Sequence, residues 1–273
     1  MAEEKEKKKE FIHSKIWEEI PEPDNPFAAA ACYCSGYDVY GDLLGKISWI
    51  EYLYLLFKLE PPTKDQAKLL EGLAVAIANP GPRDLSVRGA MNGGVGGSTA
   101  AACLMAALAP GAGQYGGARE VYLAVKLWNK CGFDLNCWQE SVKNYEKDEK
   151  LEVWPEMEHP PGFDPHGVSC ATPVKQTLKY LSGISSGAAL KWLLAYQTEV
   201  EQAADCPLAM TGVVAAALVD LKFDAEQAEI LFLLLRLPGA AAHALEQKHQ
   251  GWRKYPFFSK GVVLTNDPGP SLE

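Results

Sequence analysis

A glycine-rich stretch, residues 111–118, combines residue types that could contact a ligand. It reads Gly-Ala-Gly-Gln-Tyr-Gly-Gly-Ala and joins two segments of helical character. Glycines let the backbone approach a ligand, and N–H groups at the start of a helix lack partners within that helix. Gly116 and Gly117 are therefore candidate binding residues, although a plain turn fits them equally. Tyr115 is neutral near pH 7 and could donate a hydrogen bond to an oxyanion; a packed aromatic ring is the alternative.

Two histidines have neighbours suited to acid–base chemistry or to carbonyl polarisation. His166 lies two residues after Asp164, and a carboxylate can orient an imidazole that acts as a base. The alternative is a polar pair that faces water. His243 lies in the last apolar segment, where it could polarise a carbonyl or serve as a structural histidine.

Several arginines border the turns of the chain and indicate an anionic ligand. Arg236 lies within an apolar helical stretch, where an unpaired guanidinium is costly, so it must meet an anion. That anion is either a substrate carboxylate or an internal Asp or Glu. Arg83, Arg88 and Arg119 flank the two turns expected to face a ligand, and are candidate substrate-binding residues. Each of these three, taken alone, is more often a solvated surface charge.

Composition and charge exclude several classes of protein. The chain has 273 residues, 48% of them hydrophobic and 22% charged, which is enough for one large domain or two smaller ones. A net charge of −9 argues against a nucleic-acid scaffold. The most apolar stretch, residues 228–242, contains Arg236 and Pro238 and is too short to cross a bilayer. We therefore expect neither a nucleic-acid partner nor a membrane partner.

The seven cysteines are scattered and include no Cys-x-x-Cys pair. With only five histidines in the chain, a zinc site is not expected, and reduced thiols in the cytoplasm fit the pattern. Residues 1–10 are a solvated charge run without the apolar segment of a signal peptide. The sequence therefore predicts a cytoplasmic protein without a metal.

The segments that must position these residues have the period of helices. Thr63 with Gln66 predicts a capping box at one helix start, and Asp224 with Gln227 predicts a cap for a last long helix that Pro238-Gly239 kinks. Residues 129–165 form the least regular region. The pattern predicts an all-α chain of about a dozen helices, among them segments 47–59, 83–108, 119–128, 173–196 and 210–221.

Three stretches together resemble the citrate synthase superfamily. They are the glycine-rich joint, the entry segment that begins Gly-Tyr-Asp at residue 36, and the ending with Arg236, Pro238-Gly239 and the order His-x-Leu-Glu-Gln from His243. The resemblance is greatest to the branch with citryl-CoA lyase and the C-terminal module of ATP-citrate lyase. It implies a large helical domain (residues 21–118 and 222–273) and a small helical domain (119–221), while the charge run predicts a flexible segment at residues 1–20. It also implies a homodimer with an acyl-CoA in the cleft between the domains.

The resemblance also shows which catalytic positions differ from the family pattern. The joint histidine of the family falls on Tyr115, and the catalytic aspartate falls on Thr211, which cannot itself be a base near neutral pH. His166 lies one place after the position of another family histidine. Arg236 and His243 match the carboxylate-binding arginine and the histidine of the last helix. The candidate catalytic set is therefore Tyr115, His166, His243 and Thr211.

These matches imply a carbon–carbon lyase or synthase that acts on a carboxylated acyl-CoA with an altered catalytic set. Coenzyme A is the expected cofactor, as part of substrate or product. The alternative is a catalytically silent CoA-binding subunit, which would form a hetero-oligomer with an active paralogue. A CoA-independent binder of a keto acid or dicarboxylate is a third hypothesis. The residues expected to contact CoA are Gly116, Gly117, Lys175, Lys248, Arg253 and Lys254.

Overall fold

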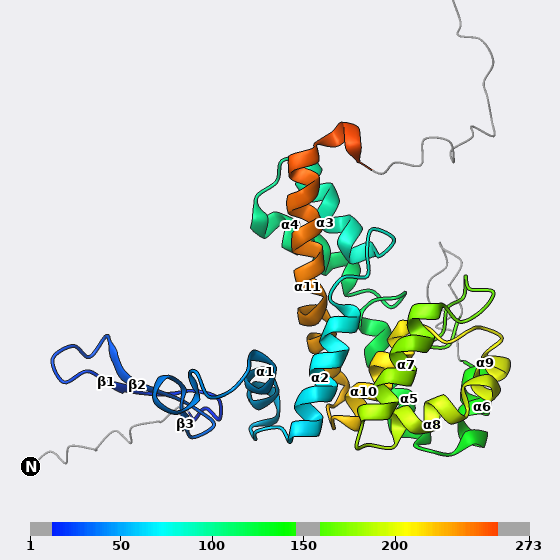
Figure 1. The fold of residues 1–273 in the computed structure, drawn as a ribbon, viewed down its shortest axis with the longest axis horizontal. Helices are drawn as coiled ribbons and strands as arrows, with labels where there is room; N and C mark the ends of the chain where they lie inside the picture. The colour runs from blue at the N-terminus through cyan, green and yellow to red at the C-terminus, as the bar shows by residue number, and fades with distance from the viewer. Residues whose placement is uncertain (1–12, 146–158, 256–273) are drawn as a thin grey trace, which may run out of the picture.

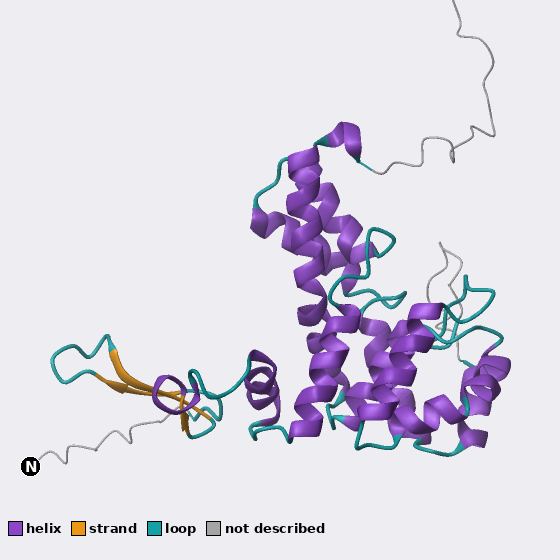
Figure 2. Ribbon diagram, viewed as in Figure 1, coloured by secondary structure: helices purple, strands orange, loops and turns teal. Residues whose placement is uncertain are grey.

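The structure, a computed structural model, describes residues 13–145 and 159–255 (Figure 1). Helices account for most of the described chain, which confirms the all-α prediction (Figure 2). The elements, in order, are β1 (Glu18–Pro21), β2 (Ala29–Cys34), β3 (Tyr37–Asp38), η1 (Val39–Leu43), α1 (Trp49–Lys58), α2 (Lys64–Ile77), α3 (Leu85–Val95), α4 (Ala100–Gly111), α5 (Ala118–Cys131), α6 (Leu135–Lys143), α7 (Thr172–Ile184), α8 (Ala189–Ala195), α9 (Gln197–Ala204), α10 (Met210–Asp220), α11 (Ala225–Gln250) and η2 (Trp252–Lys254).

The strands form one small antiparallel sheet in the order β1-β2-β3, which lies apart from the helical body (Figure 2). The sequence pattern predicted no strand here, and residues 1–20 were expected to be flexible. Glu18–Pro21 pairs with β2, and the flexibility of residues 1–20 stays a prediction. The alternation of apolar and polar residues that indicates a strand is weak here, because only Cys32 and Cys34 of β2 are buried. The charge run at residues 1–10 lies outside the described residues.

The helices pack around two apolar clusters. The larger cluster draws on α1, α2, α5 to α10 and the first half of α11. The smaller one contains Val87, Ala90, Met91, Cys103, Ala107, Ala240 and Ala244, and so joins α3, α4 and the second half of α11. These three helices project from the rest of the body as an arm (Figure 1). The clusters do not follow the predicted boundaries at residues 118 and 222, and the division into a large and a small domain stays a prediction.

Two expected helices are each broken into two. The segment 83–108 is interrupted between α3 and α4, where Gly97 has a φ of +76° and Thr99 caps α4. The segment 173–196 is interrupted after Ser185, where the carboxylate of Asp220 accepts from the Ser185 hydroxyl and from the N–H groups of Ala189 and Leu190 at the start of α8. In both places side-chain caps replace the backbone hydrogen bonds that a continuous helix would need.

The last helix, α11, has 26 residues and continues through Pro238. The N–H of Gly239 donates to the carbonyl of Ala78 at the end of α2. This bond to another element compensates for the disturbance that a proline causes in a helix. By length and mean hydropathy α11 is long enough to cross a membrane, contrary to our expectation from residues 228–242, but it packs in both apolar clusters as a core helix does.

Cys131 and Cys137 form a disulfide, with their Cα atoms 5.3 Å apart. The expectation that all seven thiols are reduced is therefore wrong for this pair. The turn at Gly132, where φ is +52°, brings the end of α5 to the start of α6 and so closes the distance. The other five cysteines are free. A cytoplasmic location stays a prediction.

Candidate functional site

A cavity of about 560 Å³ lies where several segments that are distant in the sequence meet. It is lined by the turn from Asn79 to Asp84, by Gly116 of the glycine-rich joint, by Asp164, by the start of α10 and by α11. Four predicted site residues line it, namely Arg83, Gly116, Thr211 and Arg236. Residues distant in the sequence are thus brought to one place, as a binding site requires.

Close backbone contact holds the loop that carries Asp164 against α10. The N–H of Ala209 donates to the carbonyl of Gly162 over 2.9 Å, and the N–H of Asp164 donates to Pro207 over 2.8 Å. A Cβ atom on Gly212 would lie 2.5 Å from the carbonyl oxygen of Gly162, so only glycine fits there. This contact places Asp164 and Thr211 at the same cavity.

The joint before α5 is shaped by two glycines. Gly116 has a φ of +70°, which disfavours other residues, and Gly117 is the N-cap of α5. A Cβ atom on Gly117 would lie 2.3 Å from the carbonyl oxygen of Gly113. Tight packing thus explains Gly117, whereas Gly116 also lines the cavity.

A buried carboxylate, Glu120, connects three of the segments around the cavity. Its Oε1 accepts hydrogen bonds from the N–H of Gly162 over 2.9 Å and from the hydroxyl of Thr211 over 2.6 Å. Its Oε2 accepts one from the N–H of Gly116 and lies 3.8 Å from Nε2 of His159. Both Glu120 and His159 are buried.

Glu120 and His159 were not among the residues predicted for the site. The signal for Glu120 was its register: it shares one face of α5 with the buried residues Ala124 and Trp128, four and eight positions later. A carboxylate on an apolar face requires buried donors. His159 lies in an irregular, proline-rich stretch, where no periodic pattern indicates which residues are buried.

The guanidinium of Arg236 meets an internal carboxylate. Nη2 is paired with Asp84, and Nη1 donates to the carbonyl of Gly116 over 3.1 Å. The other oxygen of Asp84 caps α3 by accepting from Ser86 and Val87. Burial lowers the pKa of Arg236 to about 10, which leaves it cationic at neutral pH. Of the two anions considered for Arg236, the structure contains the internal one.

Tyr115 and His166, two of the predicted catalytic residues, are not among the described residues that line the cavity. The ring centroid of Tyr115 lies 5.9 Å from that of His159, and its hydroxyl accepts from the amide of Gln114. The ring of His166 is exposed, and its contact with Asp164 runs through its backbone N–H. Asp164 therefore does not orient the imidazole as expected.

His243 does not line the cavity itself but contacts a residue that does. Its Nε2 lies 2.9 Å from Oδ1 of Asn79, a residue of the lining. Its Nδ1 is 3.9 Å from Glu246 on the next turn of α11. His243 thus orients Asn79, which agrees with a structural role more directly than with contact to a substrate carbonyl.

Apart from Arg83, the exposed basic residues of the predicted set lie outside this cavity. Arg88 donates to the carbonyl of Pro82, and Arg119 pairs with Glu229 across 3.2 Å. Lys248 lines a separate small apolar pocket between α4 and α11. The side chains of the remaining three are exposed: Lys175, Arg253 and Lys254.

Comparison with solved structures shows what this arrangement of helices resembles. Citryl-CoA lyase from Hydrogenobacter thermophilus superposes with a TM-score of 0.67 and 19% identity, covering 97% of this chain and 98% of that one. ATP citrate lyase from Methanothrix soehngenii, bound to citrate and coenzyme A, gives a TM-score of 0.71 and 16% identity. This chain has a citrate synthase-like fold.

The citrate synthase-like fold extends over nearly the whole chain. The match to ATP citrate lyase covers 96% of this chain but 42% of that one. A mutant of the Methanosaeta concilii ATP citrate lyase in complex with (3S)-citryl-CoA matches with the same TM-score, 0.71. No protein-family model matches the chain, and no curated protein matches it significantly.

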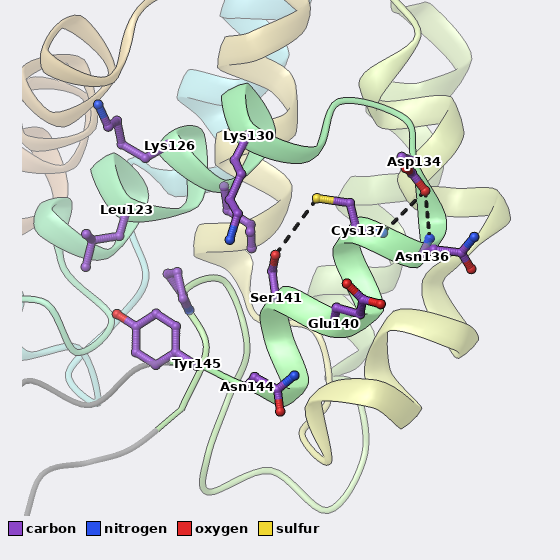
Figure 3. Close-up of a pocket in the computed structure, with 12 residues that line it drawn as sticks. Leu123, Lys126, Lys130, Asp134, Asn136, Cys137, Glu140, Ser141, Asn144 and Tyr145 are labelled. Carbon is purple, nitrogen blue, oxygen red and sulfur yellow. Dashed lines mark hydrogen bonds between the residues drawn. The ribbon is translucent and has the colours of Figure 1, made fainter.

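Another hollow, of about 800 Å³, lies on this citrate synthase-like fold between α5 and α6 (Figure 3). Lys126, Lys130, Glu140 and Ser141 line it, and no predicted site residue does. Its basic and acidic side chains are mixed, so it does not favour an anion. Within the described residues no group of three or more His, Cys, Asp or Glu is placed to hold a metal ion.

Proposed function

We propose that this protein is a carbon–carbon lyase or synthase that acts on a carboxylated acyl-CoA. The observation that carries the proposal is the cavity of about 560 Å³, which gathers Arg83, Thr211, Asp164 and Asn79 in a citrate synthase-like fold. Its size falls in the range of small-molecule sites, about 300–1,000 Å³. Solved structures of this fold contain citrate with coenzyme A, or citryl-CoA, which supports the same ligand class here.

The lining residues suit a carboxylated thioester. Arg83 offers a guanidinium to a carboxylate of the ligand. Asn79, oriented by His243, offers an amide N–H to the oxygen that becomes an enolate when the bond breaks. Asn79 thus takes the part of the neutral donor that was predicted for Tyr115. Asp164 and Thr211 supply oxygen atoms that can accept protons or hydrogen bonds.

A homodimer formed through the arm of α3, α4 and α11 is part of this proposal. Large apolar side chains of this arm are exposed, among them Met105 (63% exposed) and Leu245 (57%). Exposed apolar surface of this kind marks protein interfaces. A paralogue with the same arm would form the hetero-oligomer that the silent-subunit hypothesis requires.

One observation favours that second function, a silent CoA-binding subunit. Neither Tyr115 nor His166 is among the described residues lining the cavity, so two of the expected catalytic groups do not meet a ligand there. Such a subunit would bind coenzyme A without turnover. Measurement of both binding and cleavage separates the two functions.

The experiment is calorimetric titration of the purified protein with coenzyme A, acetyl-CoA and citrate, followed by an assay of citryl-CoA cleavage. Binding with cleavage supports the lyase, binding without cleavage supports the silent subunit, and no binding contradicts both. Arg83→Ala should weaken citrate binding by about tenfold or more, because a charged hydrogen bond contributes about 1.5–3 kcal/mol. Lys191→Ala, which removes an exposed cation of α8 outside the cavity, is the control and should bind citrate like the wild type.

A further inference from the structure

The hydroxyl of Thr211 and the carboxylate of Glu120 form a hydrogen-bonded pair behind the cavity wall. Thr211 lines the cavity, and Glu120, 2% exposed, lies behind it at 2.6 Å. A hydroxyl has one proton, and Thr211 donates its proton to Glu120, so the Oγ1 lone pairs remain for a ligand. Thr211 therefore presents a hydrogen-bond acceptor, and a ligand group that matches it must carry a donor.

The carboxylate of Glu120 is surrounded by hydrogen-bond donors. Besides Thr211, the N–H groups of Gly116 and Gly162 donate to it, one to each carboxylate oxygen. These donors match an ionised carboxylate, which is an acceptor at both oxygens. The same contacts fix the position of Glu120 relative to Thr211, so the direction of the hydrogen bond between them is set before a ligand arrives.

We infer that Thr211 takes the hydroxyl proton of a β-hydroxyacyl-CoA while it passes its own proton to Glu120. The hydroxyl carbon becomes a carbonyl, the adjacent carbon–carbon bond breaks, and its electron pair forms the enolate of the CoA thioester. The proton on Glu120 then returns through Thr211 to the α-carbon of the enolate. Atoms and charge balance without another reactant, and the reverse sequence is a synthesis. Thr211 is the catalytic residue, and Glu120, which acts through Thr211, is the positioning residue. This inference rests on the proposed function.

A binding experiment tests the acceptor role without relying on turnover. The binding of citryl-CoA and of its analogue that lacks the 3-hydroxyl is measured for the wild type and for Thr211→Val. The measurements are made in the cold by rapid mixing, so that binding is observed before cleavage. The wild type should prefer the hydroxylated compound by about tenfold, the value of one hydrogen bond, and Thr211→Val should show no preference. An equal preference for the hydroxylated compound in both proteins overturns this inference but leaves the proposed function intact. Failure of the wild type to bind either compound overturns the proposed function as well.

A kinetic experiment tests the relay. Thr211→Val and Glu120→Gln should each lower kcat about 100-fold or more with little change in KM, because proton transfer contributes about 10²–10⁴-fold. Thr211→Ser should stay within about tenfold of the wild type, because it keeps the hydroxyl. The double variant should be no slower than either single one. Glu229→Gln, which alters the ion pair of Glu229 with the exposed Arg119 outside the cavity, is the control and should turn over normally.

Three results would overturn the relay. One is full activity in Thr211→Val, and loss of activity in Asp164→Asn would then identify Asp164, which also lines the cavity, as the base. Another is a wild type that binds citryl-CoA without cleaving it, which favours the silent subunit. The third is a Glu120 that only supports the fold, which would lower the unfolding midpoint of Glu120→Gln and leave kcat of Thr211→Val unchanged.

Discussion

At the scale of single residues, two buried charges organise the cavity. Glu120 and Arg236 each lie on a buried helix face, and each is compensated by internal partners rather than by solvent. Arg236 depends on Asp84, which accepts from it with one oxygen and caps α3 with the other. A buried ion pair contributes little relative to apolar residues, but loss of one partner leaves an uncompensated charge.

Asp84→Asn should therefore destabilise the protein by about 3 kcal/mol. Asparagine caps a helix as well as aspartate does, so the loss comes from the unpaired guanidinium rather than from α3. Chemical denaturation measures the change. Asp134→Asn is the matched control, because Asp134 caps α6 with the same pattern of backbone bonds and should change stability by less than about 0.5 kcal/mol. Equal losses in the two variants would show that capping, not the ion pair, matters.

At the scale of elements, the contact of the loop around Gly162 with α10 decides the geometry of the site. Each of the two segments has a glycine where they come closest, and a Cβ atom on Gly162 would lie 2.9 Å from Cα of Gly212. Thr211 is the neighbour of Gly212 and Asp164 lies two residues after Gly162. The separation of these two polar groups thus depends on how closely the two segments pack.

Gly212→Ala should destabilise the protein by about 2 kcal/mol or more, because the added methyl group forces the loop away from α10. The displacement should also weaken binding of citryl-CoA. Gly183→Ala is the control: it lies in α7, a Cβ atom there meets nothing within 4 Å, and alanine should stabilise the helix by about 0.5–1 kcal/mol. Urea denaturation of both variants measures the difference, and a neutral Gly212→Ala would contradict the packing argument.

At the scale of the whole molecule, the arm of α3, α4 and α11 differs from the rest of the body. Its apolar cluster consists mainly of small residues, and Met105 and Leu245 remain exposed on it. An arm with a small core of its own gains stability when a second copy covers its apolar side chains. We therefore place the interface of the proposed homodimer there.

Sedimentation velocity tests this placement. The wild type should sediment as a dimer, and Met105→Glu or Leu245→Glu should shift it toward the monomer, because the new charge would be buried without a partner. Leu194→Glu is the matched control: Leu194 is an exposed leucine of α8, outside the arm, and its variant should stay dimeric. A monomeric wild type would contradict the proposal.

The fold class and the starts of several helices follow from local sequence patterns. Helical periodicity, together with the capping boxes of Thr63 with Gln66 and of Asp224 with Gln227, predicted α2 and α11 as the structure has them. These signals are local, since they depend on residues three or four positions apart. The order of motifs along the chain was enough for the resemblance to the citrate synthase superfamily, whose fold the solved structures share.

The set of side chains that meet at the cavity depends instead on long-range packing. Arg83, Gly116, Thr211 and Arg236 were predicted and do line it, whereas Tyr115 and His166 do not. The partners of Arg236 and Thr211, Asp84 and Glu120, are 152 and 91 positions away along the chain. Residue type shows that a buried charge or hydroxyl needs a partner, but the identity of that partner depends on the approach of distant backbones, which no local pattern records.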